Sequence, residues 1–220
     1  MADEIKKKEL KHFMINGEYG GDQDWFLDPM MHLGGCAAET ACDSSLYFAL
    51  HLGIPDAYPY DPDHLTKKDY VRFSGIMKPY ISPRFSGVNR LDIYIDGFAS
   101  YLADRGVTEI GMEELPGELP AAEAWDALVK QIDGGLPVPC LILNHNDPEI
   151  RKEYQWHWFL LNGYRETKKG HRLVKAVTYG EYQWVDFDRL WNTGYAQKGG
   201  LVLYRREKIR AANLRYFKTD

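Results

Sequence analysis

The stretch from residue 33 to residue 53 constrains the fold most, because its own residues dictate where it must lie. Two glycines precede Cys36, and neither Gly nor Pro interrupts the chain from there until Gly53. This pattern predicts a helix that begins at Cys36 and ends before Gly53. Small or apolar side chains recur on one face at helical spacing: Ala38, Ala41, Cys42, Ser45, Leu46 and Ala49. We therefore expect a central, buried helix that packs closely against a sheet.

Cys36 is the first candidate for chemistry in this helix. Unpaired backbone N–H groups and the positive end of the helix dipole favour thiolate over thiol at a helix N-terminus. The alternative is structural, since a free cysteine usually behaves as a small buried hydrophobic residue. Cys42 in mid-helix and Cys140 in the apolar run 137–143 fit that alternative. We therefore expect Cys36 to react with an alkylating reagent well ahead of the other two.

A second stretch, Tyr154 to Tyr164, gives Cys36 a partner. Its density of aromatic and apolar residues between charged loops predicts a strand with His157 near its start. A lone histidine in an apolar strand is more often a core residue than a base. A cysteine at a helix start that is followed far downstream by such a histidine is nevertheless the arrangement of thiol enzymes.

These two segments resemble the papain-like cysteine peptidase superfamily, and within it the bacterial bacteriocin-processing-type peptidases. The resemblance rests on residues 34–38, Gly-Gly-Cys-Ala-Ala, and on residues 157–164, His-Trp-Phe-Leu-Leu-Asn-Gly-Tyr. The family begins its helix with Cys-Gly, where this chain has Cys36-Ala37. The resemblance implies one papain-like domain over residues 1–220, with Cys36 as nucleophile and His157 as its base.

The resemblance also implies an oxyanion donor, for which Gln23 is the candidate. Papain-like enzymes use a glutamine a few residues before the cysteine, beside the cysteine's own backbone N–H. Gln23 lies 13 residues before Cys36. The role therefore requires residues 28–33 to form an extra excursion, and the alternative is a solvated loop glutamine.

The group that orients the histidine is where this chain departs from the family, which uses an Asn or Asp on the following strand. The matching segment, residues 174–180, contains neither. Three accounts stay open: Thr178 accepts the ring N–H, a carboxylate such as Asp186 reaches in, or the site works as a dyad or not at all. We favour Thr178 because it lies at the strand end where the family's polar residue sits. Its alternative is a threonine chosen for strand propensity.

Helices precede strands along the chain, which predicts an α+β fold with a largely antiparallel sheet. The segment to Gly21 is polar, and we expect it to be loosely attached. The charged tail from Glu207 to Asp220 is a candidate surface helix or edge cover. Further helices are expected over 66–78, from a cap at Asn89 to Gly106, and over 121–133. Strands are expected over Val138–Asn144, Tyr154–Tyr164, Arg172–Thr178, Glu181–Phe187 and Gly200–Arg206.

Composition limits the remaining function classes. The net charge of −5 argues against a nucleic-acid-binding surface. The charged N-terminus lacks a signal-peptide core and no run is long enough to span a bilayer, so we expect a cytoplasmic protein without a membrane partner. Three irregularly spaced cysteines do not describe a disulfide framework. His32, Cys36 and Cys42 are poor zinc ligands because Cys42 points to another side of the helix, so we expect neither metal nor cofactor.

The sequence thus predicts a thiol hydrolase that acts on a peptide or another amide. An acyl transferase on the same fold and a papain-like binding module that has lost activity are the alternatives. Two aromatic pairs, Trp25 with Phe26 and Trp156 with Trp158, are candidates to line the cleft. Strand alternation places His157 on the face opposite both tryptophans, so at most one set is expected to face the substrate.

Overall fold

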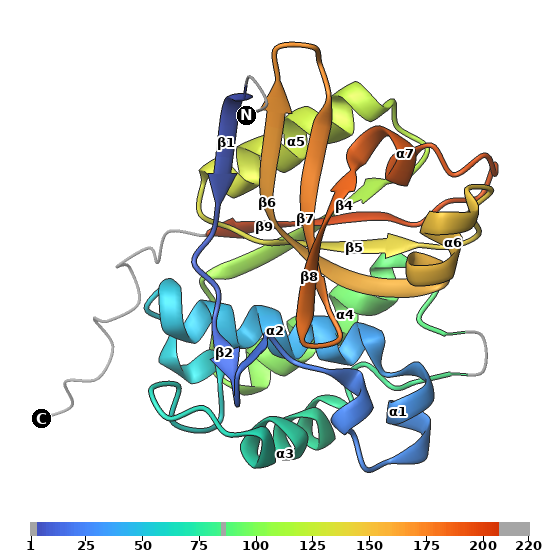
Figure 1. Cartoon of the computed structure of the whole chain (residues 1–220). Helices are drawn as coiled ribbons and strands as arrows, with labels where there is room; N and C mark the ends of the chain where they lie inside the picture. The colour runs from blue at the N-terminus through green and yellow to red at the C-terminus, as the bar shows by residue number, and fades with distance from the viewer. Residues whose placement is uncertain (1–3, 85–86, 207–220) are drawn as a thin grey trace, which may run out of the picture.

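The computed structural model describes residues 4–84 and 87–206, and within them it is a mixed α+β structure (Figure 1). The described strands form a seven-stranded sheet in the order β4-β9-β5-β6-β7-β8, with β1 paired to the far half of β6, and a separate small hairpin. All the pairings are antiparallel, which confirms the predicted fold class. The strands are β1 Glu4–Glu9, β2 Met14–Ile15, β3 Glu18–Tyr19, β4 Ile110–Pro116, β5 Val138–Ile142, β6 His157–Thr167, β7 Arg172–Thr178, β8 Glu181–Asp186 and β9 Gly200–Arg206.

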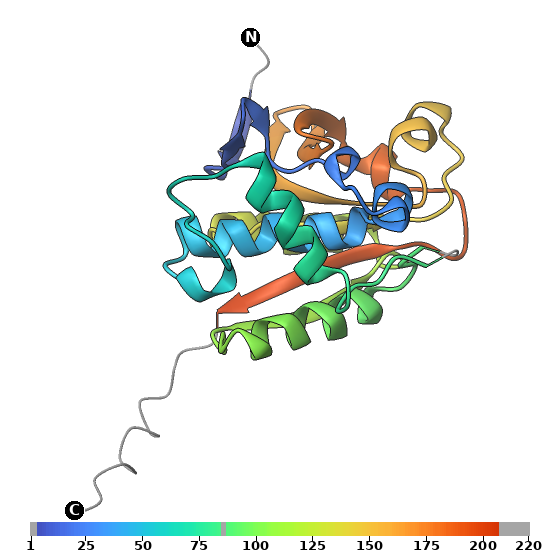
Figure 2. The ribbon, with the colours of Figure 1, turned by 90° about the horizontal axis from the view of Figure 1, so that it is seen from below.

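Helices α1 to α4 lie in the lower part of Figure 1, beneath the sheet, whereas α5 lies behind the sheet and α6 and α7 lie beside it. Helix α2 packs on β6, α4 packs on β4 and β9, and α5 packs on β1, β5, β6 and β9. In the view from below in Figure 2, α2 and α4 appear on opposite sides of β9. The helices are η1 Gln23–Trp25, α1 Pro29–Gly34, α2 Cys36–His51, η2 Pro55–Ala57, α3 Lys67–Met77, α4 Leu91–Asp104, α5 Ala121–Asp133, α6 Pro148–Tyr154 and α7 Phe187–Trp191.

Helix α2 is the buried centre that the sequence predicts. Every residue from Cys36 to Phe48 is buried, so the helix is surrounded on all sides rather than amphipathic. Small side chains make this possible, because they let α3, η2 and β6 approach the α2 backbone closely. Gly53 follows the helix with a φ of +71°, a left-handed conformation that glycine adopts at a helix end without strain.

The N-terminal segment is not loosely attached, and that expectation is wrong. β1 pairs with the C-terminal half of β6. β2 and β3 form a hairpin, and the side chains of Ile15 in β2 and of the preceding Phe13 are buried. The lysine run that suggested a solvated tail belongs to β1. Charged side chains are common on edge strands, where they discourage pairing with other chains. The segment therefore completes the sheet and the core.

Other boundaries also differ from the expectation. The strand expected from Tyr154 begins at His157, because residues 148–154 form α6 with Asp147 as its N-cap. Arg90 rather than Asn89 occupies the N-cap of α4. Strand β4 and helix α7 were not expected. The tail from Glu207 to Asp220 lies outside the described residues.

The part of the chain that the structure describes contains no helix long and apolar enough to cross a bilayer. Helix α2 illustrates why: it is the most deeply buried helix, yet its interior carries Glu39, Asp43 and several hydroxyl groups. Burial of α2 is therefore achieved by close packing around its small side chains rather than by an uninterrupted apolar run.

Candidate functional site

Cys36 lies where two helices meet almost without a linker. α1 ends at Gly34, Gly35 serves as the N-cap of α2, and Cys36 is the first residue of α2. A Cβ at Gly35 would lie 2.3 Å from the carbonyl oxygen of Met31, so only glycine allows this junction. The junction holds the cysteine at the helix N-terminus, with 8% of the residue exposed.

His157 opens β6 and reaches across to the end of β7. Its Nε2 lies 2.7 Å from the Thr178 hydroxyl oxygen. A hydroxyl can accept from a protonated Nε2, and that tautomer leaves Nδ1 as the unprotonated nitrogen. Of the three accounts for the orienting group, this contact is the one that brings a polar side chain to the ring, whereas Asp186 caps α7 by accepting from Arg189 N–H.

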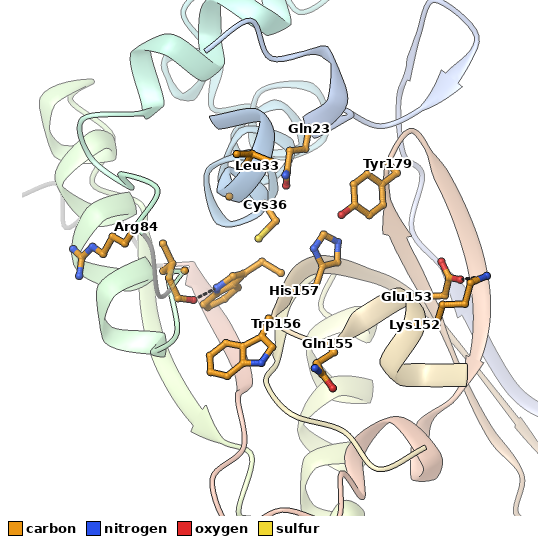
Figure 3. A pocket seen from close by; sticks show the side chains of 14 residues that line it. Gln23, Leu33, Cys36, Arg84, Lys152, Glu153, Gln155, Trp156, His157 and Tyr179 are labelled. Carbon is orange, nitrogen blue, oxygen red and sulfur yellow. Dashed lines mark hydrogen bonds and ion pairs between the residues drawn. The ribbon is translucent and has the colours of Figure 1, made fainter. Parts of the chain in front are cut away.

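Cys36 and His157 line the same cavity, which has a volume of about 550 Å³. Figure 3 shows the cysteine sulfur and the imidazole ring beside each other in the wall of this cavity. His145, another histidine of this region, has its Nε2 3.0 Å from the Arg189 carbonyl oxygen and its Nδ1 accepting from Asp147 N–H. The two residues that the sequence proposes as a pair are therefore brought together by the fold.

Tyr179 is a site residue that the sequence analysis missed. Its ring stacks on His157 with the centroids 4.9 Å apart and the planes 2° from parallel, and its hydroxyl points into the cavity (Figure 3). Tyr179 and Gly180 form the two-residue turn between β7 and β8, both with positive φ. The available signal was an X-Gly pair between two predicted strands, which indicates such a turn.

The turn is held in place by the N-terminal arm, which is the segment from β1 to Gly21. Gly180 N–H donates to the Gly21 carbonyl at 2.8 Å, and Tyr19 N–H donates to the Gly180 carbonyl at 2.6 Å. Gly21 N–H in turn donates to the Asp43 carboxylate of α2, at 3.1 Å from Oδ1. A continuous set of hydrogen bonds thus links the nucleophile helix to the turn that carries Thr178 and Tyr179.

Gln23 lies in the wall of the same cavity, within η1. The excursion that an oxyanion role requires is present, because α1 occupies half of the chain between Gln23 and Cys36. Its Nε2 donates to the His32 carbonyl at 2.6 Å, which fixes the amide and leaves it one further N–H. The alternative of a solvated loop glutamine is wrong, since 6% of the residue is exposed.

The aromatic lining differs from the expectation. Trp156 and Trp158 both line the cavity together with His157. Trp156 precedes β6 and has a φ of +55°, so strand alternation does not apply to it. Trp158 stacks on Tyr94 with the centroids 4.6 Å apart. Trp25 and Phe26 are instead buried against Tyr70.

Burial controls the protonation of the pair. It raises the pKa of Cys36 to about 11, although the backbone N–H groups of Trp158, Ala37 and Cys36 itself act in the opposite direction. Burial likewise lowers the pKa of His157 to about 4. The thiolate expected from the helix N-terminus is therefore not the resting form, because desolvation outweighs the dipole. Between these values the pair rests as neutral thiol and neutral imidazole.

Glu39 lies one turn further along α2 and is buried. Burial raises the pKa of its carboxyl well above the usual range, and the nearby carboxylates Asp43 and Asp22 act in the same direction. Charge on Glu39 would raise the pKa of Cys36 further. A protonated Glu39 carries no charge, so it adds little to the raised pKa of the thiol.

Within residues 4–84 and 87–206, no group of three or more His, Cys, Asp and Glu side chains is placed to hold a metal ion. Chemically the site can offer a thiol, a nearby base with its orienting hydroxyl, and backbone N–H groups at a helix start. Comparisons of the chain with protein-family models, curated proteins and solved structures find no match.

Proposed function

We propose that this protein is a papain-like thiol hydrolase that cleaves a peptide or another amide bond. One observation carries the proposal: Cys36 at the start of α2 and His157 at the start of β6 line one cavity, while Thr178 contacts the far nitrogen of the imidazole at 2.7 Å. Nucleophile, base and orienting group, in that order, are the parts that acyl transfer to a thiol requires. A reducing cytoplasm would keep Cys36 a free thiol.

The chemistry follows from this order. His157 Nδ1 takes the thiol proton as the sulfur attacks the carbonyl carbon, and the imidazolium then returns it to the leaving amine. The Cys36 backbone N–H and the remaining N–H of the Gln23 amide are the donors for the oxyanion. Water, deprotonated by His157, then hydrolyses the thioester and regenerates the thiol. An amine in place of water would make the protein an acyl transferase.

A binding module that has lost activity is the second candidate, and the neutral, buried thiol is the observation that favours it. The pKa of His157, about 4, lies well below that of the thiol, about 11, so the proposed reaction requires the proton to move to the ring as the sulfur attacks and not beforehand. The two candidates differ in whether His157 accelerates reactions of Cys36.

The test uses limiting iodoacetamide near neutral pH, with the site of labelling mapped by mass spectrometry. We expect Cys36 to be labelled first, because Cys42 and Cys140 are 0% and 1% exposed. His157→Gln should slow this labelling at least tenfold, since it removes the base, whereas His64→Gln at an exposed position should not. Labelling of Cys42 or Cys140 ahead of Cys36 refutes the nucleophile. Labelling of Cys36 at a rate that His157→Gln leaves unchanged favours the binding module.

A further inference from the structure

Strand β8 is an edge of the sheet and begins directly after the turn that carries Tyr179. It pairs with β7 on one side, with Thr178 opposite Glu181 and Ala176 opposite Gln183. In a hairpin with a two-residue turn these are the hydrogen-bonded pairs. The N–H and C=O groups of the alternate residues, Tyr182 and Trp184, therefore point away from β7, toward the open side of the strand.

A groove runs from the Cys36 cavity along this strand. A cavity of about 120 Å³ shares Glu153 and Tyr179 with the Cys36 cavity and is bordered by Ala176 and Thr178. A further cavity of about 300 Å³ shares Glu153 with it and lies between α6 and residues 183–186 of β8. The three cavities thus adjoin one another, and α6 forms the wall opposite β8.

The groove carries an excess of negative charge. In the two cavities beside β8 the cations Lys152 and Arg189 are already paired: Lys152 lies 3.0 Å from Glu153, and Arg189 lies 2.7 Å from both Asp147 and Glu149. Glu181, which lines the groove beside the turn, is exposed and has no ion-pair partner among the described residues. A ligand with a positive charge would therefore complement this wall.

We propose that the groove between α6 and β8 binds an extended peptide segment of the substrate, with a basic side chain placed near Glu181. The segment adds to β8 as a further strand and forms main-chain hydrogen bonds with Tyr182 and Trp184. This inference rests on the proposed function, because it takes the Cys36 cavity as the place where the scissile bond lies. It names a substrate class: an unfolded or extended polypeptide with a Lys or Arg on one side of the bond.

The test is disulfide exchange at Cys36, which needs no turnover. Short alanine-based peptides carry cysteine at one end, as a mixed disulfide with cysteamine, and a single Lys or Met at successive positions. Attack by the Cys36 sulfur forms a disulfide with the peptide and releases cysteamine, with no net oxidation. Mass spectrometry gives the ratio of Lys to Met conjugates for each position.

Two series of peptides are used, one with cysteine at the N-terminus and one with cysteine at the C-terminus. In one of them we expect the Lys conjugate to exceed the Met conjugate about threefold at one position, which is the effect of a surface ion pair. Glu153→Gln/Glu181→Gln should bring the ratio to about one. The matched control, Glu114→Gln, changes an exposed carboxylate on β4 at the opposite edge of the sheet and should preserve it. Equal conjugation of both peptides at every position, or a preference that the double variant keeps, overturns the groove.

The strand pairing has its own signature. N-methylation of successive peptide nitrogens should lower conjugation at alternate positions only, because every second N–H of an added strand faces β8. An effect without this alternation overturns the pairing. If cystamine itself does not modify Cys36, the result contradicts the proposed function and with it this inference. This outcome differs from failure of the groove alone, because no peptide conjugate then forms at all.

Discussion

Replacing Thr178 by Val tests the weakest link between this site and a functioning thiol enzyme. Valine keeps the shape of the side chain and its strand propensity, but it removes the oxygen that lies 2.7 Å from His157 Nε2. The ring is 5% exposed, so water has little access to replace that oxygen. The substitution therefore leaves one nitrogen of the imidazole without a partner in both of its protonation states.

The magnitude follows from the difference between those states. A neutral hydrogen bond contributes about 0.5–1.5 kcal/mol, whereas one from a charged donor contributes about 1.5–3 kcal/mol. The imidazolium formed when His157 takes the thiol proton therefore loses about 1 kcal/mol more than the neutral ring. This corresponds to a reduction of about fivefold in the rate at which Cys36 reacts.

The assay is the rate of Cys36 alkylation as a function of pH. Since the pKa of His157 is about 4 and that of Cys36 about 11, the part of the rate that depends on transfer of the thiol proton to His157 should be constant between these limits and form a plateau, whereas the reaction of the free thiolate should rise toward the upper limit. Thr178→Val should lower the plateau about fivefold and leave the rise toward pH 11 in place. Thr108→Val, at an exposed position, is the matched control. An unchanged plateau refutes the orienting role of Thr178, and an equal loss at every pH indicates a general distortion.

Two further predictions concern stability. The folded pKa of His157 is about 4 against an ordinary value of 6.5, so the unfolded chain binds the extra proton first as the pH falls. Its contribution is complete above about pH 6.5 and is lost toward pH 4, by up to about 3 kcal/mol, which urea unfolding of wild type and His157→Gln across this range should resolve. Asp43→Asn should lower the free energy of unfolding by about 2 kcal/mol, because the buried carboxylate accepts from Gly21 N–H at 3.1 Å and from the Tyr70 hydroxyl at 2.7 Å. The exposed Asp63→Asn should change the urea midpoint little, and an equal effect of both would contradict the role of the buried network.

The predicted elements that match the structure carry strong local signals. Helix α5 and strands β7 and β9 have the expected bounds, since each combines a clear periodicity with a glycine or a polar turn beside it. The helix expected from residue 66 also begins there, because Thr66 is the N-cap of α3 and its hydroxyl accepts from Asp69 N–H. In these segments local chemistry and tertiary packing favour the same structure.

The missed elements divide by cause. Helices α1 and α6 each begin with an Asp-Pro pair in which the aspartate caps the helix, a start signal that was present in the sequence and was not used. Strands β1 and β4 are different, because their charged residues give no apolar alternation. β1 is specified by the edge of β6 that it pairs with, and this is long-range information that no local window contains.

The candidate site was predictable in its residues but not in its electrostatics. A helix N-terminus beside Cys36 indicates a low pKa, yet the structure gives a raised one. The helix dipole lowers the pKa of Cys36 both in the sequence-based expectation and in the structure. What the sequence does not reveal is how completely the sheet and its neighbours exclude water from the sulfur, and the cost of burying charge depends on that exclusion.

The N-terminal arm connects the two halves of the site, and this gives it a consequence for catalysis. Cys36 belongs to the helical layer, whereas His157 and Thr178 belong to the sheet, so their separation depends on how these layers are joined. Besides the packing of α2 on β6, they are joined by Asp43, Gly21 and Gly180 through consecutive hydrogen bonds. The proposed function requires the imidazole to stay within reach of both the sulfur and the Thr178 hydroxyl, so a shift of about 1 Å at the turn would move the ring away from one of them. Under that proposal we expect the arm to act as a positioning element for His157, although none of its side chains needs to touch the substrate.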